Sequence, residues 1–557
     1  MAKNNRKYPL TDKRRSTQPS AARLSCAGLV TTLVASMVTI AVQARQPRLV
    51  VGIMVDGLNQ EYVDRLRSHF GPDGFNRFMR QGIVLENVDY GTSLDPTAAT
   101  AVIMTGASPS VNGIAGALHY DPTAKRHTPS LNDPAAIGNY TDETYSPRAL
   151  RVTTLSDESR IAGAGVTYAY SIAPDPVQAI IMAGHSGNSA AWLNERTGNW
   201  ASTTYYGDMP TPLTQRNRMT PLDKRLETMV WEPSQATSQY GELPYHLTRY
   251  PFHYTFQRGN QDRIAAFKAS PLINTEITQL ATDYINALQL GAHDGTDMLN
   301  VAYTLQPYPF SKTAENRYEL TDSYIKLDAE LAKLLSTIDQ RVGADGAIVF
   351  VAATPPSSRR RRDDQRWNIP TGEFSTLKAA SLLNLYLMAI HGNGEWVKAI
   401  NGRHVYLNDE LAKARNVDIA GLRRQSAAYL KRMAGVDRAT SVDDVLSGST
   451  GYDNGEALRR NTLISASGDV LIDLKPGWEL VDDYNDRSAA SHTKMVTVNA
   501  LTTAPVYMLI PETEPQTIKR VVDARVIAPT VAGQMHIRPP NGAALPPLRF
   551  SESEHER

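Results

Sequence analysis

The chain has 557 residues and a net charge of +1, with 41% hydrophobic and 21% charged residues. This length predicts one large domain with insertions, or two domains. The balanced charge excludes a protein whose overall field attracts nucleic acid. Cys26 is the only cysteine, so the chain forms no internal disulfide.

A basic segment and then an apolar segment open the sequence. Residues 1–25 are basic and polar, residues 26–42 carry no charge, and Val42-Gln43-Ala44 fits the small-x-small pattern of a cleavage site. We therefore expect residues 1–44 to be a signal peptide and the protein to be exported, periplasmic or otherwise extracytoplasmic. The alternative is a retained anchor, because the apolar run approaches the lower limit of about 17 residues for a membrane span. We expect no other span.

Strand and helix patterns alternate between residues 45 and 550. Apolar runs predict strands at residues 49–55, 83–90, 165–173, 178–184, 297–305, 346–354 and 504–510, and helical periodicity or helix-start signals predict helices at 59–70, 74–81, 97–106 and 320–342. Such units are typical of an α/β fold, in which helices flank a mostly parallel sheet. Residues 185–290 and 365–475 break the alternation, and we interpret both as inserted caps at the carboxyl edge of the sheet. Residues 551–557 form a polar tail.

The first predicted strand ends in a carboxylate. Asp56 follows the apolar run that starts at Leu49, and Gly57 comes next. The carboxyl ends of parallel strands are where α/β proteins place ligand-binding and metal-binding groups. Asp56 is therefore a candidate functional residue, and the alternative is an ordinary loop residue at the protein surface.

Five segments resemble one known family in the same order along the chain. They are VVGIMVDGL at 50–58, MTGASPSVNGIAG at 104–116, IIMAGHSGNSAAWLNERTGNW at 180–200, YIKLDAELAKLLSTID at 324–339 and VIAPTVAGQMHIRPPNGA at 526–543. The chain resembles the type I phosphodiesterase and nucleotide pyrophosphatase branch of the alkaline phosphatase superfamily. The resemblance implies an alkaline-phosphatase-like fold. It also implies phosphoester hydrolysis at two zinc ions by a Thr or Ser nucleophile.

Most of the zinc ligands that the resemblance implies are substituted. Asp56 matches the first ligand of the family. Pro307 and Ser311 stand where the family has an Asp and a His, and Thr354 and Pro355 replace the start of an Asp-His-Gly motif. A proline side chain has no lone pair to offer a metal. His492 lies two residues away from the register of a further expected His.

The residues that hold phosphate in the family are also replaced. Ala117 stands where an Asn is expected, and Asp175 and Val177 stand near the places of a Lys and an Arg. Thr97 aligns with the nucleophile only if one residue is deleted, and Pro96 takes its place otherwise. Thr97 and the nearby Thr100 are equally well explained by helix capping and packing.

A zinc site needs three or four protein ligands, and the matched positions do not supply them. We therefore expect a catalytically degenerate member of the superfamily without a cofactor, which serves as a binding or assembly component of the cell envelope. Its partner would be another envelope protein and not a nucleic acid. The alternative is a metal-dependent phosphoric ester hydrolase with a rearranged site, in which Thr97 is the nucleophile and Asp56, Asp95 and His492 bind zinc.

Overall fold

The computed structural model describes residues 46–241, 251–311, 317–355, 372–475, 477–481, 483 and 502–550, together with the backbone of 494–496. The chain divides into a unit Met1–Ala44 and a unit Arg45–Arg557, and every described residue belongs to the second unit. The predicted signal peptide, the polar tail and His492 lie outside the described residues. In the described part of the chain, no helix has both the length and the apolar composition needed to span a bilayer.

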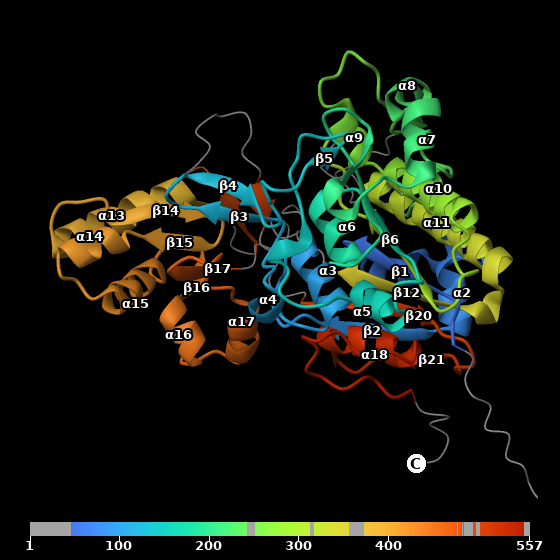
Figure 1. Ribbon diagram of the computed structural model, residues 1–557. Coiled ribbons are helices and arrows are strands. Elements are labelled where there is room, and N and C mark those ends of the chain that lie inside the picture. Colours follow the sequence, from blue (N-terminus) through green and yellow to red (C-terminus); the bar gives the residue numbers. More distant parts are fainter. Residues whose placement is uncertain are drawn as a thin grey trace, which may run out of the picture. The chain divides into compact units, whose positions relative to one another are not determined.

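An eleven-stranded sheet is the centre of the described structure (Figure 1). Its strand order is β21-β2-β20-β12-β1-β11-β6-β7-β8-β5, and β22 pairs with β2. Neighbours from β12 to β7 are parallel, whereas β20 is antiparallel to both of its neighbours, so the predicted mostly parallel α/β fold is confirmed. The strands are β1 (Leu49–Asp56), β2 (Ile83–Asp89), β5 (Gly138–Asn139), β6 (Ala169–Ala173), β7 (Ser189–Leu193), β8 (Trp200–Thr203), β11 (Asp297–Thr304), β12 (Ala347–Thr354), β20 (Thr503–Leu509), β21 (Gln516–Ile518) and β22 (Val522–Asp523).

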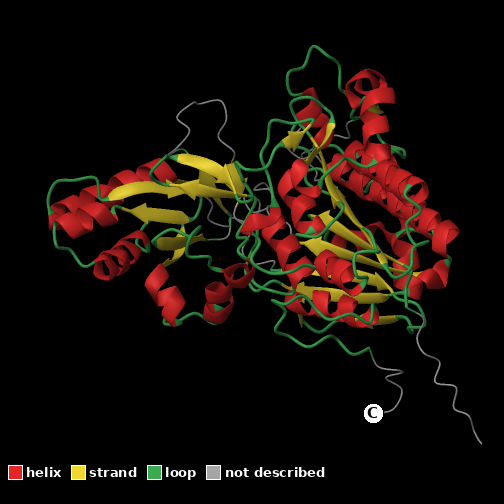
Figure 2. Cartoon of the chain, viewed as in Figure 1, coloured by secondary structure: helices red, strands yellow, loops and turns green. Residues whose placement is uncertain are grey.

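Two groups of helices cover the sheet (Figure 2). The first group, whose members contact one another, consists of α3 (Pro96–Thr105), α5 (Leu155–Ala162), α6 (Pro176–Ala183) and α18 (Ile527–Gln534). The second consists of α1 (Gln60–Leu66), α2 (Phe75–Gln81), α10 (Leu272–Ala287) and α11 (Arg317–Val342). The central strands are apolar along nearly their whole length because helices bury both of their faces.

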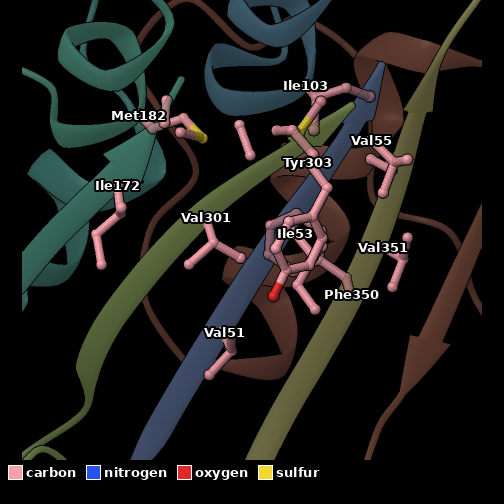
Figure 3. Close-up of a cluster of buried hydrophobic side chains, with 14 of the residues drawn as sticks. Val51, Ile53, Val55, Ile103, Ile172, Met182, Val301, Tyr303, Phe350 and Val351 are labelled. Atoms are coloured by element: carbon pink, nitrogen blue, oxygen red, sulfur yellow. The ribbon is translucent and has the colours of Figure 1, made fainter. Parts of the chain in front are cut away.

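The central strand β1 lies between β11 and β12, and the register aligns their carboxyl ends. Asp56 is paired with Thr304 on one side and Thr354 on the other. Figure 3 shows how side chains of β1, β11 and β12 pack together in this core. Space is tight at Gly52, where a Cβ atom would lie 2.4 Å from Asn300 Oδ1 and 2.7 Å from Phe350 Cζ.

The strand predicted at residues 178–184 is wrong, because this segment forms helix α6. All of its residues from Val177 to Ala183 are buried, between the sheet and α3. A helix that is buried on every side has no polar face, so its apolar run cannot be distinguished by periodicity from a buried strand. Asp175 at the N-cap position and Pro176 in the first turn were the available signals for a helix.

The region 185–290 differs from the predicted insertion. Its first strands, β7 and β8, belong to the central sheet, and α10 packs against β11. The parts outside the main sheet and α10 are α7 (Thr211–Met219), α8 (Leu222–Arg225), α9 (Arg263–Lys268) and the strand pair β9 (Val230–Trp231) and β10 (Tyr254–Thr255). Trp192, Trp200 and Tyr284 of this region are core residues of the main sheet, whereas Trp231 and Tyr240 belong to a separate aromatic cluster.

The region 365–475 has a hydrophobic core of its own, with Leu383, Trp396, Ile400 and Leu430 at its centre. Its helices were predicted, but its four-stranded sheet in the order β14-β15-β17-β16 was not. The elements are α13 (Thr376–His391), β14 (Val397–Asn401), β15 (His404–Leu407), α14 (Asp409–Ala414), α15 (Ile419–Leu430), β16 (Val436–Ser441), α16 (Val442–Ser447), α17 (Gly455–Asn461) and β17 (Val470–Leu474). The region extends beyond residue 475 through a three-stranded sheet. Its strands are β13 (Gly372–Ser375), β18 (Trp478–Val481) and β19 (Lys494–Val496).

Candidate functional site

Asp56 lies at the carboxyl edge of the central sheet, as predicted, and it contacts the end of the neighbouring strand. The Thr354 hydroxyl donates a hydrogen bond of 3.2 Å to Asp56 Oδ1, and the Gly57 backbone N–H donates to Thr354 Oγ1 at 3.4 Å. Gly57 has a φ of +84°, a conformation in which glycine is favoured. Thr354 therefore acts as a hydrogen-bond partner of Asp56.

A glutamine that the sequence analysis missed makes the second contact with Asp56. Gln178 Nε2 donates to Asp56 Oδ1 at 3.2 Å and lies 3.4 Å from Oδ2, and it also donates to Thr100 Oγ1 at 3.1 Å. The Thr100 hydroxyl in turn donates to the Pro96 carbonyl at 2.9 Å. Gln178 and Thr100 are buried. Amide and hydroxyl donors thus surround the carboxyl group of Asp56.

Burial raises the pKa of Asp56 from 3.8 to about 7. The negative charges of Asp175 and Asp95 raise this pKa further, whereas the hydrogen bonds from Thr354 and Gln178 lower it. No lysine, arginine or histidine contributes among these causes. Asp56 therefore takes up a proton near neutral pH instead of remaining a firmly charged ligand.

Asp95 and Thr97 form the start of helix α3. Asp95 is the N-cap residue, and its Oδ1 accepts hydrogen bonds from Thr97 N at 2.8 Å and from Ala117 N at 3.2 Å. Burial raises the pKa of Asp95, and the bonds from Thr97 and Ala117 oppose that shift. Thr97 lies in the first turn with 7% of its surface exposed. The structure therefore brings both residues to the edge near Asp56, where they cap a helix.

The loop after β11 contains Pro307 and Ser311, where the resemblance predicts two further substituted ligands. Ser311 Oγ donates to Glu319 Oε1 at 2.9 Å and accepts a bond from the Tyr254 hydroxyl at 3.3 Å. Tyr308, which follows Pro307, packs its ring 4.9 Å from that of Trp231 and 4.7 Å from that of Tyr254. This loop is thereby part of an aromatic cluster, defined by Trp231, Tyr240, Phe252, Tyr308 and Tyr318. In this loop Ser311 is thus engaged in hydrogen bonds and Tyr308 in aromatic packing.

Ala117, Asp175 and Val177 are the residues that the resemblance predicts at the family's phosphate-binding positions. Val177 is buried within α6, and the backbone of Ala117 serves the cap of α3. Asp175 is exposed and pairs with Lys268 of α9, whose ammonium group also lies 3.4 Å from Glu195. The cation at this edge of the sheet is therefore already bound by two carboxylates.

The donor set at Asp56 does not fit zinc. In the ranges that the structure describes, there is no group of three or more His, Cys, Asp or Glu side chains that could hold a metal ion. Thr354 uses its hydroxyl proton on Asp56, and the buried Pro355 that follows has no donor atom. His492 lies outside these ranges. Among the described residues, Asp56 and the nearby Asp95 supply two carboxylates, which falls short of the three or four ligands that zinc requires.

The fold defines the class of protein. The crystal structure of the alkaline phosphatase PafA superposes with a TM-score of 0.79 at 24% sequence identity, over 90% of this chain and 98% of that one. The fold is therefore that of the alkaline phosphatases.

The model of the type I phosphodiesterase / nucleotide pyrophosphatase family matches residues 50–498, and the chain belongs to this family. A protein of Myroides odoratus named calcium-transporting ATPase is 26% identical over 529 residues, which cover 90% of this chain and 94% of that protein. Alkaline phosphatase PafA of Elizabethkingia meningoseptica is 25% identical over 531 residues, with the same coverage. The family resemblance predicted from the sequence is confirmed.

Proposed function

We propose that the protein is a catalytically degenerate member of its family and acts as a binding or assembly component of the cell envelope. The observation that carries this proposal is the hydrogen bond from Thr354 to Asp56. It puts a neutral hydroxyl, followed by a proline, at the strand end where the family resemblance implies metal ligands.

Three further features support the loss of hydrolysis. The loop of Pro307 and Ser311 is committed to packing, as the ring contacts of Tyr308 show. Asp175 places a negative charge at a position where the resemblance implies a cation. The Thr97 hydroxyl is hydrogen-bonded to Asp95, the carboxylate that caps α3, and among the described residues no group of metal-binding side chains is present to activate it.

The role in binding and assembly follows from what the chain retains. The sheet and its two helical layers are intact, so the scaffold can present its surfaces to a partner even without chemistry. The basic and apolar segments of residues 1–44 predict export, so the partner would be another protein of the envelope.

The test is an assay of the purified protein with a phosphate monoester and a phosphate diester, with added zinc and with a chelator. We expect the same negligible turnover in all conditions, and the same value for the Thr97→Ala variant. Metal analysis of the purified protein should find less than one zinc ion per chain.

The second candidate is the metal-dependent phosphoesterase with a rearranged site. The observation that favours it is the position of Thr97 in the first turn of a helix, next to Asp95. It predicts zinc-dependent turnover that disappears in the Thr97→Ala variant and falls sharply in the Asp56→Asn and His492→Ala variants. That result would overturn the degenerate assignment.

A further inference from the structure

Helix α13 carries more exposed large hydrophobic residues than any other helix that the structure describes. Leu382, Leu385 and Ile390 have 50%, 61% and 49% of their surface exposed, whereas each other described helix has at most one such residue. Leu382, Leu385 and Ala389 follow one another at steps of three and four residues, so they lie on one face of the helix. An exposed apolar patch with polar surroundings marks a surface that binds a protein or a membrane.

Helix α15 lies beside α13 and continues this surface. The rings of Tyr386 and Tyr429 stack with their centres 4.2 Å apart, and His391 is hydrogen-bonded to Gln425 at 2.8 Å. Both helices contribute to one core with the strands β14, β15 and β17, whereas the other side of these strands packs against Tyr120. Because α13 and α15 cover the same side of the sheet, their outer faces point in the same direction, away from the sheet.

The two helices bring cations but no carboxylate to this surface. Four exposed cations lie on them or directly after α15, namely Lys378, Arg424, Lys431 and Arg432. Residues 376–391 and 419–433 contain no aspartate or glutamate. Asp418, which precedes α15, uses its carboxylate to cap that helix. Within the described part of the chain, none of the four cations forms an ion pair, so their charges are available to an anionic partner.

The composition of this surface is that of a membrane-binding face. Protein interfaces are enriched in aromatic residues and depleted in lysine, and leucine is rare among the residues that dominate their affinity. Here the rings of Tyr386 and Tyr429 are half-buried and stacked on each other, and leucines and cations form the outer surface. Helices that bind at a membrane interface combine exposed leucines with lysines and arginines in this way.

We propose that the outer face of α13 and α15 docks on an anionic phospholipid bilayer. Leu382 and Leu385 enter the boundary between headgroups and acyl chains, and the four cations lie at the level of the lipid phosphates. At low ionic strength each cation near such a surface strengthens binding by about fivefold. This surface goes beyond the proposed role in the envelope, and it binds lipid whether or not the site at Asp56 hydrolyses phosphoesters.

Co-sedimentation of the purified full chain with vesicles tests the proposal. Vesicles with about 30% phosphatidylglycerol in phosphatidylcholine should be bound at least tenfold more tightly than pure phosphatidylcholine, and about 0.5 M salt should remove this preference. The Lys431→Glu/Arg432→Glu variant should bind the anionic vesicles at least tenfold more weakly, and Leu382→Ser/Leu385→Ser at least fivefold more weakly. Residues 1–44 are the same in every variant, so their own affinity for lipid cancels from the comparison.

Two matched controls distinguish this face from the rest of the surface. Lys519→Glu/Arg520→Glu reverses the charge of another exposed Lys-Arg pair, and Met219→Ser removes an exposed apolar side chain from α7. Both controls should keep the affinity of the unchanged protein within about twofold. All of the substituted side chains are exposed, so every variant should retain the circular dichroism spectrum and melting temperature of the unchanged protein.

Three outcomes would overturn the proposal. The first is equal affinity for both kinds of vesicle, or unchanged affinity in both variants of the face. The second is an equally large loss in Lys519→Glu/Arg520→Glu, since this would show that net charge alone drives binding. The third is a dimer, detected by analytical ultracentrifugation without vesicles, that Leu382→Ser/Leu385→Ser dissociates, since this would assign the face to a second copy of the chain.

Discussion

At the scale of single residues, the chemistry of Asp56 is set by its neighbours and not by its place in the strand. Its contacts are a hydroxyl from Thr354 and an amide from Gln178. Each donor satisfies a lone pair of the carboxyl group that a metal would otherwise take. An aspartate that the family resemblance predicts to be a metal ligand is thus a hydrogen-bond acceptor here.

Replacing Asp56 by asparagine should make the protein less sensitive to high pH. Because folding raises the pKa of Asp56 to about 7 from 3.8, the folded state binds this proton more tightly. The stabilisation of the folded state by this proton is complete below pH 4 and is lost as the pH rises through 7. Asp56→Asn should therefore raise the free energy of unfolding at pH 8.5 by about 1–3 kcal/mol, allowing for the partial exposure of the side chain.

Urea unfolding at pH 5 and pH 8.5 measures this difference, which should be much smaller at pH 5. An equal effect of the substitution at both pH values would contradict the raised pKa. Asp121→Asn is a suitable control, because the pKa of this partly exposed aspartate is lowered by backbone hydrogen bonds from Ala124 and Thr123.

Gly52 should not tolerate a side chain. A Cβ there would lie 2.4 Å from Asn300 Oδ1 and 2.7 Å from a ring carbon of Phe350. Gly52→Ala should lower the free energy of unfolding by about 1–3 kcal/mol, which is typical of overpacking in a core. Gly259→Ala, where the structure leaves open space around the added Cβ, should change it by less than about 0.5 kcal/mol; similar losses for both variants would contradict the argument.

At the scale of elements, the loop after β11 is a packing element. Tyr308 is buried and contacts Trp231 and Tyr254, while Ser311 is hydrogen-bonded to Glu319 at the start of α11. A metal site needs such a loop to face inward with its polar side chains. Here the Ser311 hydroxyl is already hydrogen-bonded to Glu319 and Tyr254.

Tyr308→Ala should therefore lower the free energy of unfolding and leave the chemistry of the protein unchanged. Removal of a buried aromatic ring from a packed cluster costs about 3 kcal/mol, and thermal unfolding followed by circular dichroism would detect it. Phe310→Ala in the same loop is the control, since 38% of Phe310 is exposed. A loss as large for Phe310→Ala would show that the loop, and not the aromatic cluster, accounts for the effect.

The sequence predicted some elements of the site and missed others for identifiable reasons. The meeting of Asp56 and Thr354 was predictable, because adjacent parallel strands end at the same edge. Gln178 was missed because its segment reads equally well as strand or helix when every residue is buried. The strands β14 and β15 were missed because they are short and lie between strong helical patterns. The Asp175-Pro176 pair at the start of α6 is the signal from which Gln178 could have been assigned to a helix.

At the scale of the whole molecule, zinc should not stabilise the protein. A ligand that binds only the folded state at 100 times its dissociation constant adds about 2.7 kcal/mol of stability. The described residues contain no cluster of metal-binding side chains, so we expect equal melting temperatures with zinc and with a chelator. An increase of several degrees with zinc, lost in Asp56→Asn, would establish a metal site.

The strand order has a consequence for how the molecule is made. β20 (Thr503–Leu509) separates β2 from β12, so the N-terminal strand β2 joins the sheet through a strand synthesised more than 400 residues later. Until the ribosome has passed residue 509, β2 has no neighbouring strand on the side that β20 later occupies. During that time β12 keeps an open, aggregation-prone edge. Folding of the nascent chain therefore cannot finish before translation nearly does, and the edge of β12 stays open to pairing with other chains in the meantime.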